Sequence, residues 1–330
     1  MDELIALIGR YKELGIDTQI DYEKFYLYSI ITHSTAIEGS TVTEIENQLL
    51  FDEGISAKGK TIMEQMMNLD LKRAYEESIR QAKAHSPITI NLLKSLASLV
   101  MKNTGSTYKT ALGDFSSADG DLRLVNVTAG IGGKSYMSFQ KVPTRLKEFC
   151  DWLNVERAKN MSMAERYALS FEAHYRLVTI HPWADGNGRM ARLMMNHLQF
   201  EFGLIPAKVL KEDKGEYINA LISTRENKDI HYFVDFMTKE MVKTVTSDID
   251  AFLNSTEESG EKTPKNGEKK QKSREKILTL LKKDPSFTTR KLAEAIGITP
   301  KAIEKQLAKL KAEGLIERDG PDKGGKWKVL

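Results

Sequence analysis

Apolar residues recur at helical spacing through the long first part of the chain. In the segment 22–37, Phe25, Tyr28 and Ile31 repeat every three residues, and Gly39 follows as a residue suited to end a helix. Further helices with this spacing are predicted at 62–84, 90–102, 164–180, 190–202, 216–221 and 232–253. The pattern therefore predicts a mainly α-helical protein.

One region departs from the helical pattern. The segments Leu122–Val127 and Ser135–Phe139 are rich in β-prone residues and flank the glycine-rich stretch Gly130–Gly133. Such runs on either side of glycines are typical of a β-hairpin. Because an isolated two-stranded hairpin is only marginally stable, we expect this one to lie against the helices.

A boundary follows the last of these helices. Residues 254–272 contain no large apolar side chain and are rich in glycine, serine and charge. Such a segment cannot bury enough surface to offset the entropy lost on ordering it. We therefore expect a flexible linker between two domains.

The residues after the linker have the pattern of a small separate domain. Helices are predicted at 274–283, 288–296 and 300–313, followed by strands at 314–318 and 326–330 around a glycine-rich turn. This order resembles the winged helix-turn-helix fold, in which the third helix reads DNA and the hairpin forms the wing.

Charge is distributed unevenly over the 330 residues. The net charge is +3, but the segment from Lys265 onward holds 18 Lys and Arg against 9 Asp and Glu. Such asymmetry is a reason to consider a nucleic-acid partner. Lys301, Lys305 and Lys309 share one face of the third helix and suit phosphate contacts, whereas Gln306 is nearly alone there in suiting base edges. DNA binding, docking of a protein and a purely structural role all stay open for this domain.

The sequence also bears on where the protein works. Cys150 is the only cysteine, so no disulfide can form within the chain, which fits a reducing compartment. The first residues lack the apolar stretch of a signal peptide, and no apolar run reaches the roughly 18 residues that span a bilayer. We therefore expect a cytoplasmic protein with no membrane partner.

The segment from His181 to Arg192 brings together residues suited to bind a ligand. It reads His-Pro-Trp-Ala-Asp-Gly-Asn-Gly-Arg-Met-Ala-Arg. Its proline disfavours a helical backbone at His181, and its glycines let the backbone come close to a ligand, so a turn should join two helices here. The second helix should begin around 187–189, where its free amides and positive dipole end form an anion site.

The charged side chains of this segment suit a polyphosphate. Arg189 and Arg192 share a helix face, and two guanidinium groups beside a helix N-terminus favour phosphate binding. Asp185 is a hard oxygen ligand for Mg²⁺, and His181 can take a proton near neutral pH. The combination favours chemistry on nucleotide phosphates. It is not the usual phosphate-binding loop, because no Gly-Lys-Ser/Thr follows.

The stretch His181–Arg189 resembles the motif of the Fic family, which reads His, Pro, an aromatic, any residue, Asp or Glu, Gly, Asn, Gly and Arg. Trp183 stands where Phe is commoner. The resemblance covers roughly residues 20–250. It implies a Fic helical bundle with a β-hairpin flap at about 121–139. It also implies Mg²⁺-dependent transfer of AMP from ATP to Ser, Thr or Tyr hydroxyls of target proteins, including the protein itself.

The resemblance further implies a role for each site residue. His181 would deprotonate the target hydroxyl, which attacks the α-phosphate of ATP and expels pyrophosphate, and Asp185 would bind Mg²⁺. The flap would dock the target protein as an extended strand. The phosphates would be held by the backbone amides of Gly186, Asn187 and Gly188, the Asn187 side chain, Arg189 and Arg192, while Tyr217 and Ile218 would close over adenine.

The segment Ser34–Gly39 resembles the inhibitory motif of the same family, which reads Ser or Thr, three residues, Glu, then Gly or Asn. A Glu38 carboxylate that reached Arg192 would pair with a cation that the γ-phosphate needs. It would also place negative charge where the triphosphate must lie. ATP binding would then wait until Glu38 swings away, which is a population shift. Ser34, Glu38 and Gly39 are the predicted inhibitory residues.

These features predict four segments: an N-terminal helical region with the inhibitory helix at 1–105, a Fic core at 106–253, a linker at 254–272 and a winged helix-turn-helix domain at 273–330. Two other functions stay open. The same site could remove AMP from a modified protein, with Glu38 positioning water, or the core could sense nucleotide for a DNA-binding transcription regulator. A homodimer fits a Fic protein with such an inhibitory motif.

Overall fold

The structure of the protein is a computed structural model with two compact units, Met1–Asp250 and Ala251–Leu330. It describes residues 1–19, 21–129 and 133–260, and after them 277–278, 280–282, 285, 287–296, 303, 307, 310–311, 315–319 and 326–329. Each unit is taken by itself below.

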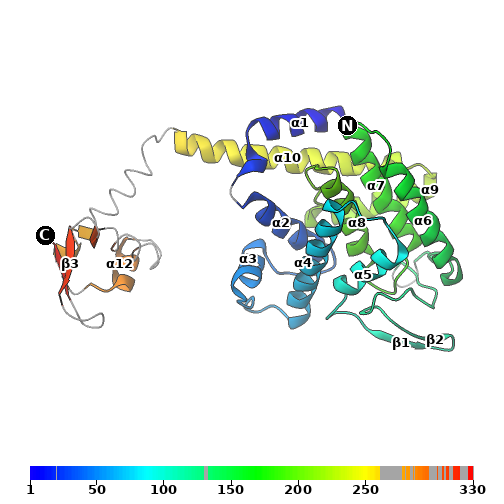
Figure 1. Ribbon diagram of the computed structural model, residues 1–330, viewed down its shortest axis with the longest axis horizontal. Helices are drawn as coiled ribbons and strands as arrows, with labels where there is room; N and C mark the ends of the chain where they lie inside the picture. Colours follow the sequence, from blue (N-terminus) through cyan, green and yellow to red (C-terminus); the bar gives the residue numbers. More distant parts are fainter. Residues whose placement is uncertain are drawn as a thin grey trace. The chain divides into compact units, whose positions relative to one another are not determined.

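The first unit is built from α-helices (Figure 1), as the sequence pattern predicts. Short 3-10 helices precede three of them: η1 (Ile16–Thr18), η2 (Phe139–Lys141) and η3 (Lys211–Asp213). The α-helices are α1 (Asp2–Glu13), α2 (Tyr22–Ile37), α3 (Glu44–Glu53), α4 (Ile62–Lys83), α5 (Ile90–Val100), α6 (Val142–Arg157), α7 (Met163–Ile180), α8 (Asn187–Glu201), α9 (Lys214–Asn227) and α10 (His231–Gly260).

Local sequence explains where several helices begin and end. Thr43, Thr61 and Ser162 each accept a hydrogen bond from the third residue of the helix that follows, and a glutamate there bonds back, which completes a capping box. At the end of α2, Gly39 adopts a φ of 106°, and the amides of Gly39 and Ser40 bond back to carbonyls of the last helical turn. The glycine thus fixes the end of α2, and the capping boxes fix the starts of α3, α4 and α7.

α8 is the centre of the helical unit. It packs against α7, α4 and α5, and nearly all of its residues are buried. Leu193 and Leu198 have no exposed surface. The buried Asn196 accepts a hydrogen bond from the Tyr75 hydroxyl at 2.7 Å and donates one to the Ala207 carbonyl at 2.9 Å. The helices around α8 therefore hold it in one position, and with it the turn that precedes it.

The structure also contains elements that the sequence pattern does not predict, among them α1 and a short hairpin. Helix α1 buries Leu4, Ile8 and Tyr11 at helical spacing. Strands β1 (Thr107–Thr110) and β2 (Gly113–Ser116) form an antiparallel hairpin that extends beyond the helices (Figure 1). Each strand has only four residues, which is too short for a clear alternating pattern in the sequence.

The flap, defined here as residues 121–139, differs from the predicted hairpin. Its described residues form a single isolated bridge, between Thr128 and Ser135, in place of two regular strands. The prediction of strands at 122–127 and 135–139 is therefore wrong. The Gly130–Gly132 part of the predicted turn lies outside the described residues.

A buried arginine explains why these strands do not form. The side chain of Arg123 is 1% exposed and donates hydrogen bonds to the carbonyl oxygens of Val125 and Met137 at 2.7 and 2.6 Å. A side chain thus uses backbone acceptors that a sheet would pair between strands. The β-prone composition of the flap is overridden by this long-range contact.

α10 continues past the predicted domain boundary. It has 30 residues and ends at Gly260, so residues 254–260, at the start of the predicted linker, are helical, and the linker itself stays a prediction. This stretch contains glutamate, serine and threonine and no proline, so nothing in it interrupts the helical hydrogen bonds. Residues 261–272 lie outside the described residues.

Neither α10 nor any other helix in the described ranges is long and apolar enough to cross a membrane.

The second unit contains α12 (Thr289–Ile296) and the antiparallel strands β3 (Ile316–Asp319) and β4 (Lys326–Val329), where the sequence predicts a helix and two strands. The predicted helices at 274–283 and 300–313 fall mostly outside the described residues, as do Lys301, Lys305, Gln306 and Lys309. The buried core of this unit consists of Ile277, Leu281, Leu292, Ala293, Ile303, Leu307, Leu310 and Ile316.

Replacing Leu193 with alanine should destabilise the first unit by about 2–5 kcal/mol, because it opens a cavity in the most enclosed helix. Urea unfolding followed by tryptophan fluorescence measures the change. Ile62→Ala removes a side chain that is 75% exposed and serves as the control, with an expected change under about 0.5 kcal/mol. Equal midpoints for the two variants would contradict the central role of α8.

Candidate active site

The segment between α7 and α8 forms a tight turn. α7 ends at Ile180, and His181 follows with a left-handed φ of 53°. α8 begins after Gly186, whose φ is 80°. The side-chain oxygen of Asn187 accepts a hydrogen bond from the Trp183 amide at 3.0 Å, and its nitrogen donates to the Trp183 carbonyl at 2.8 Å. The Asn187 side chain therefore closes the turn, and its predicted contact with phosphates stays a prediction.

The first turn of α8 is an anion site without a side-chain cap. Helices α3, α4, α5 and α7 each begin with a Thr or Ser that accepts a backbone hydrogen bond, whereas α8 has no such bond. Its first amides and the positive end of its dipole are therefore available to an anion. Gly186 permits close packing here, because a Cβ on it would lie 2.8 Å from Sδ of Met101.

Arg189 is a buried cation with weak partners. It is 3% exposed, and it donates to the Val100 carbonyl at 3.3 Å and to Sδ of Met101 at 3.0 Å. Its buried Nε has no hydrogen-bond partner among the described residues, and Oδ1 of Asp185 lies 3.9 Å from Nη2. Burial lowers the pKa of Arg189. The guanidinium of Arg189 is therefore incompletely paired, since buried charges are normally paired and fully hydrogen-bonded.

Glu38 reaches this site from the end of α2. Its Oε1 lies 2.6 Å from Nη2 of Arg192. A Cβ on Gly188 would lie 2.7 Å from the same oxygen, so the carboxylate lies directly over the first turn of α8. Ser34 accepts two further hydrogen bonds from Arg192, from Nε to its hydroxyl at 2.8 Å and from Nη2 to its carbonyl at 3.0 Å. Gly39 ends the helix and lets the chain turn away.

The electrostatics of this pair favour a charged carboxylate. Burial raises the pKa of Glu38, but Arg192, Arg189 and Lys214 outweigh that effect and hold it below its ordinary value. Nζ of Lys214 also donates to the Ile37 carbonyl at 2.7 Å, which holds the end of α2 in place. The Glu38 side chain is 33% exposed and that of Arg192 only 4%, so Glu38 is the partner that can turn toward solvent.

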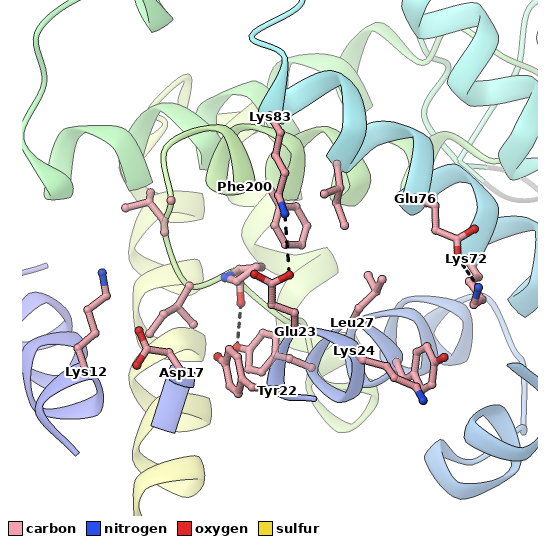
Figure 2. A pocket seen from close by; sticks show the side chains of 17 residues that line it. Lys12, Asp17, Tyr22, Glu23, Lys24, Leu27, Lys72, Glu76, Lys83 and Phe200 are labelled. Carbon is pink, nitrogen blue, oxygen red and sulfur yellow. Dashed lines mark hydrogen bonds and ion pairs between the residues drawn. The ribbon is translucent and has the colours of Figure 1, made fainter. Parts of the chain in front are cut away.

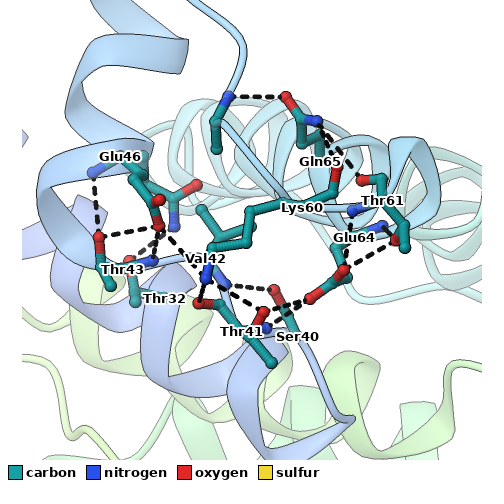
Figure 3. Close-up of polar contacts among 12 residues, drawn as sticks. Thr32, Ser40, Thr41, Val42, Thr43, Glu46, Lys60, Thr61, Glu64 and Gln65 are labelled. Carbon is teal, nitrogen blue, oxygen red and sulfur yellow. Dashed lines mark hydrogen bonds and ion pairs between the residues drawn. The ribbon is translucent and has the colours of Figure 1, made fainter.

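The backbone is anchored on both sides of Glu38. The fully buried Asn68 in α4 accepts a hydrogen bond from the Thr35 hydroxyl at 2.8 Å and donates one to the Ser40 hydroxyl at 3.1 Å. Next to it, the Glu64 carboxylate accepts hydrogen bonds from the amide and hydroxyl of Thr41 at 2.8 and 2.7 Å (Figure 3). With the chain held before and after it, Glu38 can leave Arg192 by rotating its side chain, without a movement of α2.

Tyr217 lies within the helical bundle, beside Arg192. It is 2% exposed, and its hydroxyl bonds to Nε2 of His174 at 2.9 Å and to Nη1 of Arg192 at 3.4 Å. Burial, and then the charge of Arg192, holds the pKa of His174 well below its ordinary value, so this imidazole is neutral. The structure thus places Tyr217 beside Arg192, and its predicted contact with adenine stays a prediction. Ile218, the next residue, is 40% exposed, and its contact with a base stays a prediction.

His181 is held as a neutral imidazole beside the flap. Its ring stacks on that of Tyr136, with centroids 3.7 Å apart and planes at 18°. Nδ1 lies 3.2 Å from the Val178 carbonyl, so the proton on Nδ1 donates there and Nε2 is left as the basic nitrogen. Burial lowers the pKa of His181 to about 4, and the charge of Arg123 adds to this effect, while the Val178 carbonyl and the carboxylate of Asp185 oppose it.

Asp185 fits a shared magnesium site. Its side chain is 61% exposed, and its Oδ1 accepts a hydrogen bond from the Gly186 amide at 2.6 Å. No group of three or more metal-binding side chains occurs in the part of the chain that the structure describes. A single exposed carboxylate beside an anion site suits Mg²⁺, which binds proteins through one or two carboxylates together with substrate phosphates.

Comparison with known proteins agrees with this geometry. Residues 87–199, which include the turn and most of α8, match the Fic/DOC family model. The chain contains a Fic domain. Residues 270–317 match a winged helix-turn-helix DNA-binding family, in agreement with the fold predicted for the carboxy-terminal domain.

Solved structures share the fold of the Fic domain. A Fic domain containing signaling protein from Bacteroides thetaiotaomicron matches with a TM-score of 0.63 at 22% identity, over 76% of this chain and 96% of that one. A Fic family protein from Desulfovibrio desulfuricans matches over 100% of this chain and 94% of its own, with a TM-score of 0.61 at 19% identity.

Among curated proteins, protein adenylyltransferase fic-1 of Caenorhabditis elegans is 28% identical over 237 residues. The match covers 71% of this chain and 43% of fic-1, so the chain spans less than half the length of this relative.

A cavity of about 550 Å³ lies at the start of α2, away from Glu38 at the end of that helix (Figure 2). Tyr22 and Tyr26 line it, and the Tyr26 hydroxyl donates to the Pro206 carbonyl at 2.9 Å. Three of its lysines already pair with carboxylates: Lys24 with Asp52, Lys72 with Glu76 and Lys83 with Glu23. The cavity thus differs from the Fic site, where Nε of the buried Arg189 has no hydrogen-bond partner among the described residues.

The sequence analysis does not identify three residues that contact the site: Arg123, Tyr136 and His174. The first two lie in the run interpreted as strands, where an arginine and a tyrosine are ordinary solvent-facing residues. His174 lies next to Ala173 in a helix with a strong apolar stripe. A titratable side chain on such a stripe is the sequence feature that could have identified it as a site residue. Each acquires its role through a contact with a residue distant in sequence.

The imidazole of His181 should titrate near pH 4 in the free protein and not near its ordinary value of 6.5, because burial disfavours the charged ring. NMR of the imidazole signals, assigned by their loss in His181→Ala, measures the midpoint. Since the unfolded chain binds this proton more readily, the free energy of unfolding should fall as pH drops from 6.5 toward 4. A midpoint above pH 6 would contradict the enclosed position of the ring.

Proposed function

We propose that this protein is a Mg²⁺-dependent protein adenylyltransferase that is inhibited by its own Glu38. One observation carries the proposal: the turn that begins at the neutral His181 leads directly into α8, whose N-terminus is uncapped and which carries two buried guanidinium groups. The arrangement provides an anion cradle, cationic clamps and a base in one place. The similarity to proteins named protein adenylyltransferase supports AMP as the transferred group.

The reaction follows from these groups. Nε2 of His181 takes the proton of a target Ser, Thr or Tyr hydroxyl as its oxygen attacks the α-phosphorus of ATP. A bond forms from that oxygen to the α-phosphorus, the bond from the α-phosphorus to the bridging oxygen breaks, and pyrophosphate leaves with those electrons. The α8 amides and Arg189 and Arg192 hold the phosphates in line for the attack.

Asp185 is the residue that would hold Mg²⁺, which when bound neutralises charge on the phosphates. The exposed flap beside His181 is where a target segment would lie, because a hydroxyl must come within hydrogen-bonding distance of Nε2. Self-modification fits the same site when the hydroxyl comes from a second copy of the chain.

The ion pair between Glu38 and Arg192 explains the inhibition. Arg192 directs four of its five N–H donors to Glu38, to Ser34 and to Tyr217, so at most one is left for a γ-phosphate. The carboxylate also repels the triphosphate at the start of α8. ATP therefore binds productively only in the fraction of molecules in which Glu38 has turned away.

Replacing Glu38 with glycine should raise self-modification and target modification about 5- to 150-fold, the range of typical coupling between two sites. Incubation with ATP labelled at the α-phosphate, followed by intact-mass analysis for the added AMP, measures the change. Glu44→Gly, at a carboxylate near the start of α3, is the matched control and should leave transfer unchanged. No increase in Glu38→Gly, with the protein folded and Mg²⁺ present, would contradict the inhibitory role.

In the Glu38→Gly background, His181→Ala should lower AMP transfer by about 10²–10⁴-fold, the usual contribution of a general base. Calorimetry should show ATP binding nearly unchanged, because the contacts of α8 with phosphates remain. Transfer at an undiminished rate by the folded variant would remove His181 as the base. Release of AMP from a modified target by the parent protein would instead favour AMP removal as the activity.

A further inference from the structure

Arg123, a residue of the flap, connects the flap to the active-site turn. Its backbone amide donates to the Pro182 carbonyl at 3.0 Å, and its Nε donates to the His181 carbonyl at 2.8 Å. The other two guanidinium nitrogens donate to the carbonyls of Val125 and Met137, on the two limbs of the flap. One residue thus joins both limbs of the flap to the backbone of the proposed base.

The surroundings of Arg123 are costly for a cation. The side chain is 1% exposed, and its three hydrogen-bond acceptors in the described residues are all neutral carbonyl oxygens. Replacing a buried charge by an apolar side chain of similar size often stabilises a protein. The position of Arg123 is therefore better explained by geometry, since the planar fork of a guanidinium holds several carbonyls at fixed angles.

The geometry in question is that of His181. Its φ of 53° lies in the left-handed region, which is unfavourable for a residue with a Cβ. The two hydrogen bonds from Arg123 reach the consecutive carbonyls of His181 and Pro182 and so hold the backbone on the far side of that residue. The strained conformation is thereby fixed by the flap, which is distant in sequence.

Tyr136 controls the ring of the same histidine. It stacks on His181 at 3.7 Å, and its amide donates to the Val127 carbonyl at 3.0 Å across the flap. The next residue, Met137, supplies a carbonyl to Arg123. The flap therefore fixes both the backbone of His181, through Arg123, and its ring plane, through Tyr136.

We propose that Arg123 and Tyr136 are positioning residues that hold the His181 imidazole in the orientation that the transfer needs. Arg123 sets the backbone of the turn, and Tyr136 sets the plane of the ring. Neither contacts the phosphate cradle at the start of α8. Both roles rest on the adenylyl transfer proposed above.

The kinetic test uses the full chain with Glu38→Gly. Arg123→Lys and Tyr136→Ala should each lower kcat about 10- to 100-fold, the cost of a misplaced catalytic group. The KM for ATP should change less than about threefold, because the phosphate contacts remain. Tyr136→Phe keeps the ring and should recover kcat to within about threefold of the parent. Arg145→Lys, at an exposed position of α6, is the matched control for the arginine substitution.

An equal loss in Tyr136→Phe and Tyr136→Ala would overturn the role of stacking. A rise in the KM for ATP without a loss in kcat would overturn both roles. Should Arg123→Lys fail to fold, as judged by circular dichroism, the two Tyr136 variants decide the matter.

A second readout does not depend on activity. Nuclear Overhauser contacts between the rings of Tyr136 and His181 should be strong in the full chain and in Tyr136→Phe, and lost in folded Arg123→Lys. Their persistence in Arg123→Lys would overturn the coupling through the arginine. If Glu38→Gly transfers no AMP while these contacts respond as expected, the proposed function fails and the coupling of flap and turn stands.

Discussion

Two buried cations at the start of one helix need an anion. Arg189 and Arg192 are each 3% exposed, and the positive end of the α8 dipole lies beside them. In the free protein Glu38 supplies negative charge to Arg192, whereas Nε of Arg189 is left without a partner in the described residues. In the proposed reaction the phosphates of ATP take both places. Inhibition and substrate binding are then two occupancies of one charged site, and they exclude each other.

The fold makes this competition possible by fixing both partners. α8 is enclosed by α4, α5 and α7, so the guanidinium groups cannot move away from the cradle. The end of α2 is fixed through Asn68 on either side of Glu38, although Glu38 and Arg192 lie 154 residues apart in sequence. The one adjustable group is the Glu38 side chain, which is the most exposed member of the pair. A change at a single side chain can therefore open the site without unfolding any helix.

Much of the site could be predicted because its signals are local. A proline and two glycines mark the turn, and the same twelve residues supply the base, the acidic residue and both arginines. The end of α2 also follows from its own sequence, through the glycine after Glu38. What the sequence did not show depends on packing between distant segments. The sequence does not show that the bundle encloses Tyr217 against His174 and Arg192.

The flap shows the same limit from the other direction. Its β-prone residues predict two strands, whereas the described residues of the two limbs meet in one isolated bridge, and an arginine binds a carbonyl of each limb. Short strands β1 and β2 carry too few residues to give a pattern. α10 extends past the predicted linker boundary because polar residues without a proline are compatible with a helix as well as with a linker. Composition alone does not separate those two states.

The most direct test of the competition is a crystal structure of the Glu38→Gly protein with Mg²⁺ and a non-hydrolysable ATP analogue. The account predicts the γ-phosphate within hydrogen-bonding distance of the Arg192 guanidinium and the α-phosphate facing Nε2 of His181. A triphosphate bound away from the first turn of α8, with Arg192 still held by Ser34 and Tyr217 alone, would contradict it.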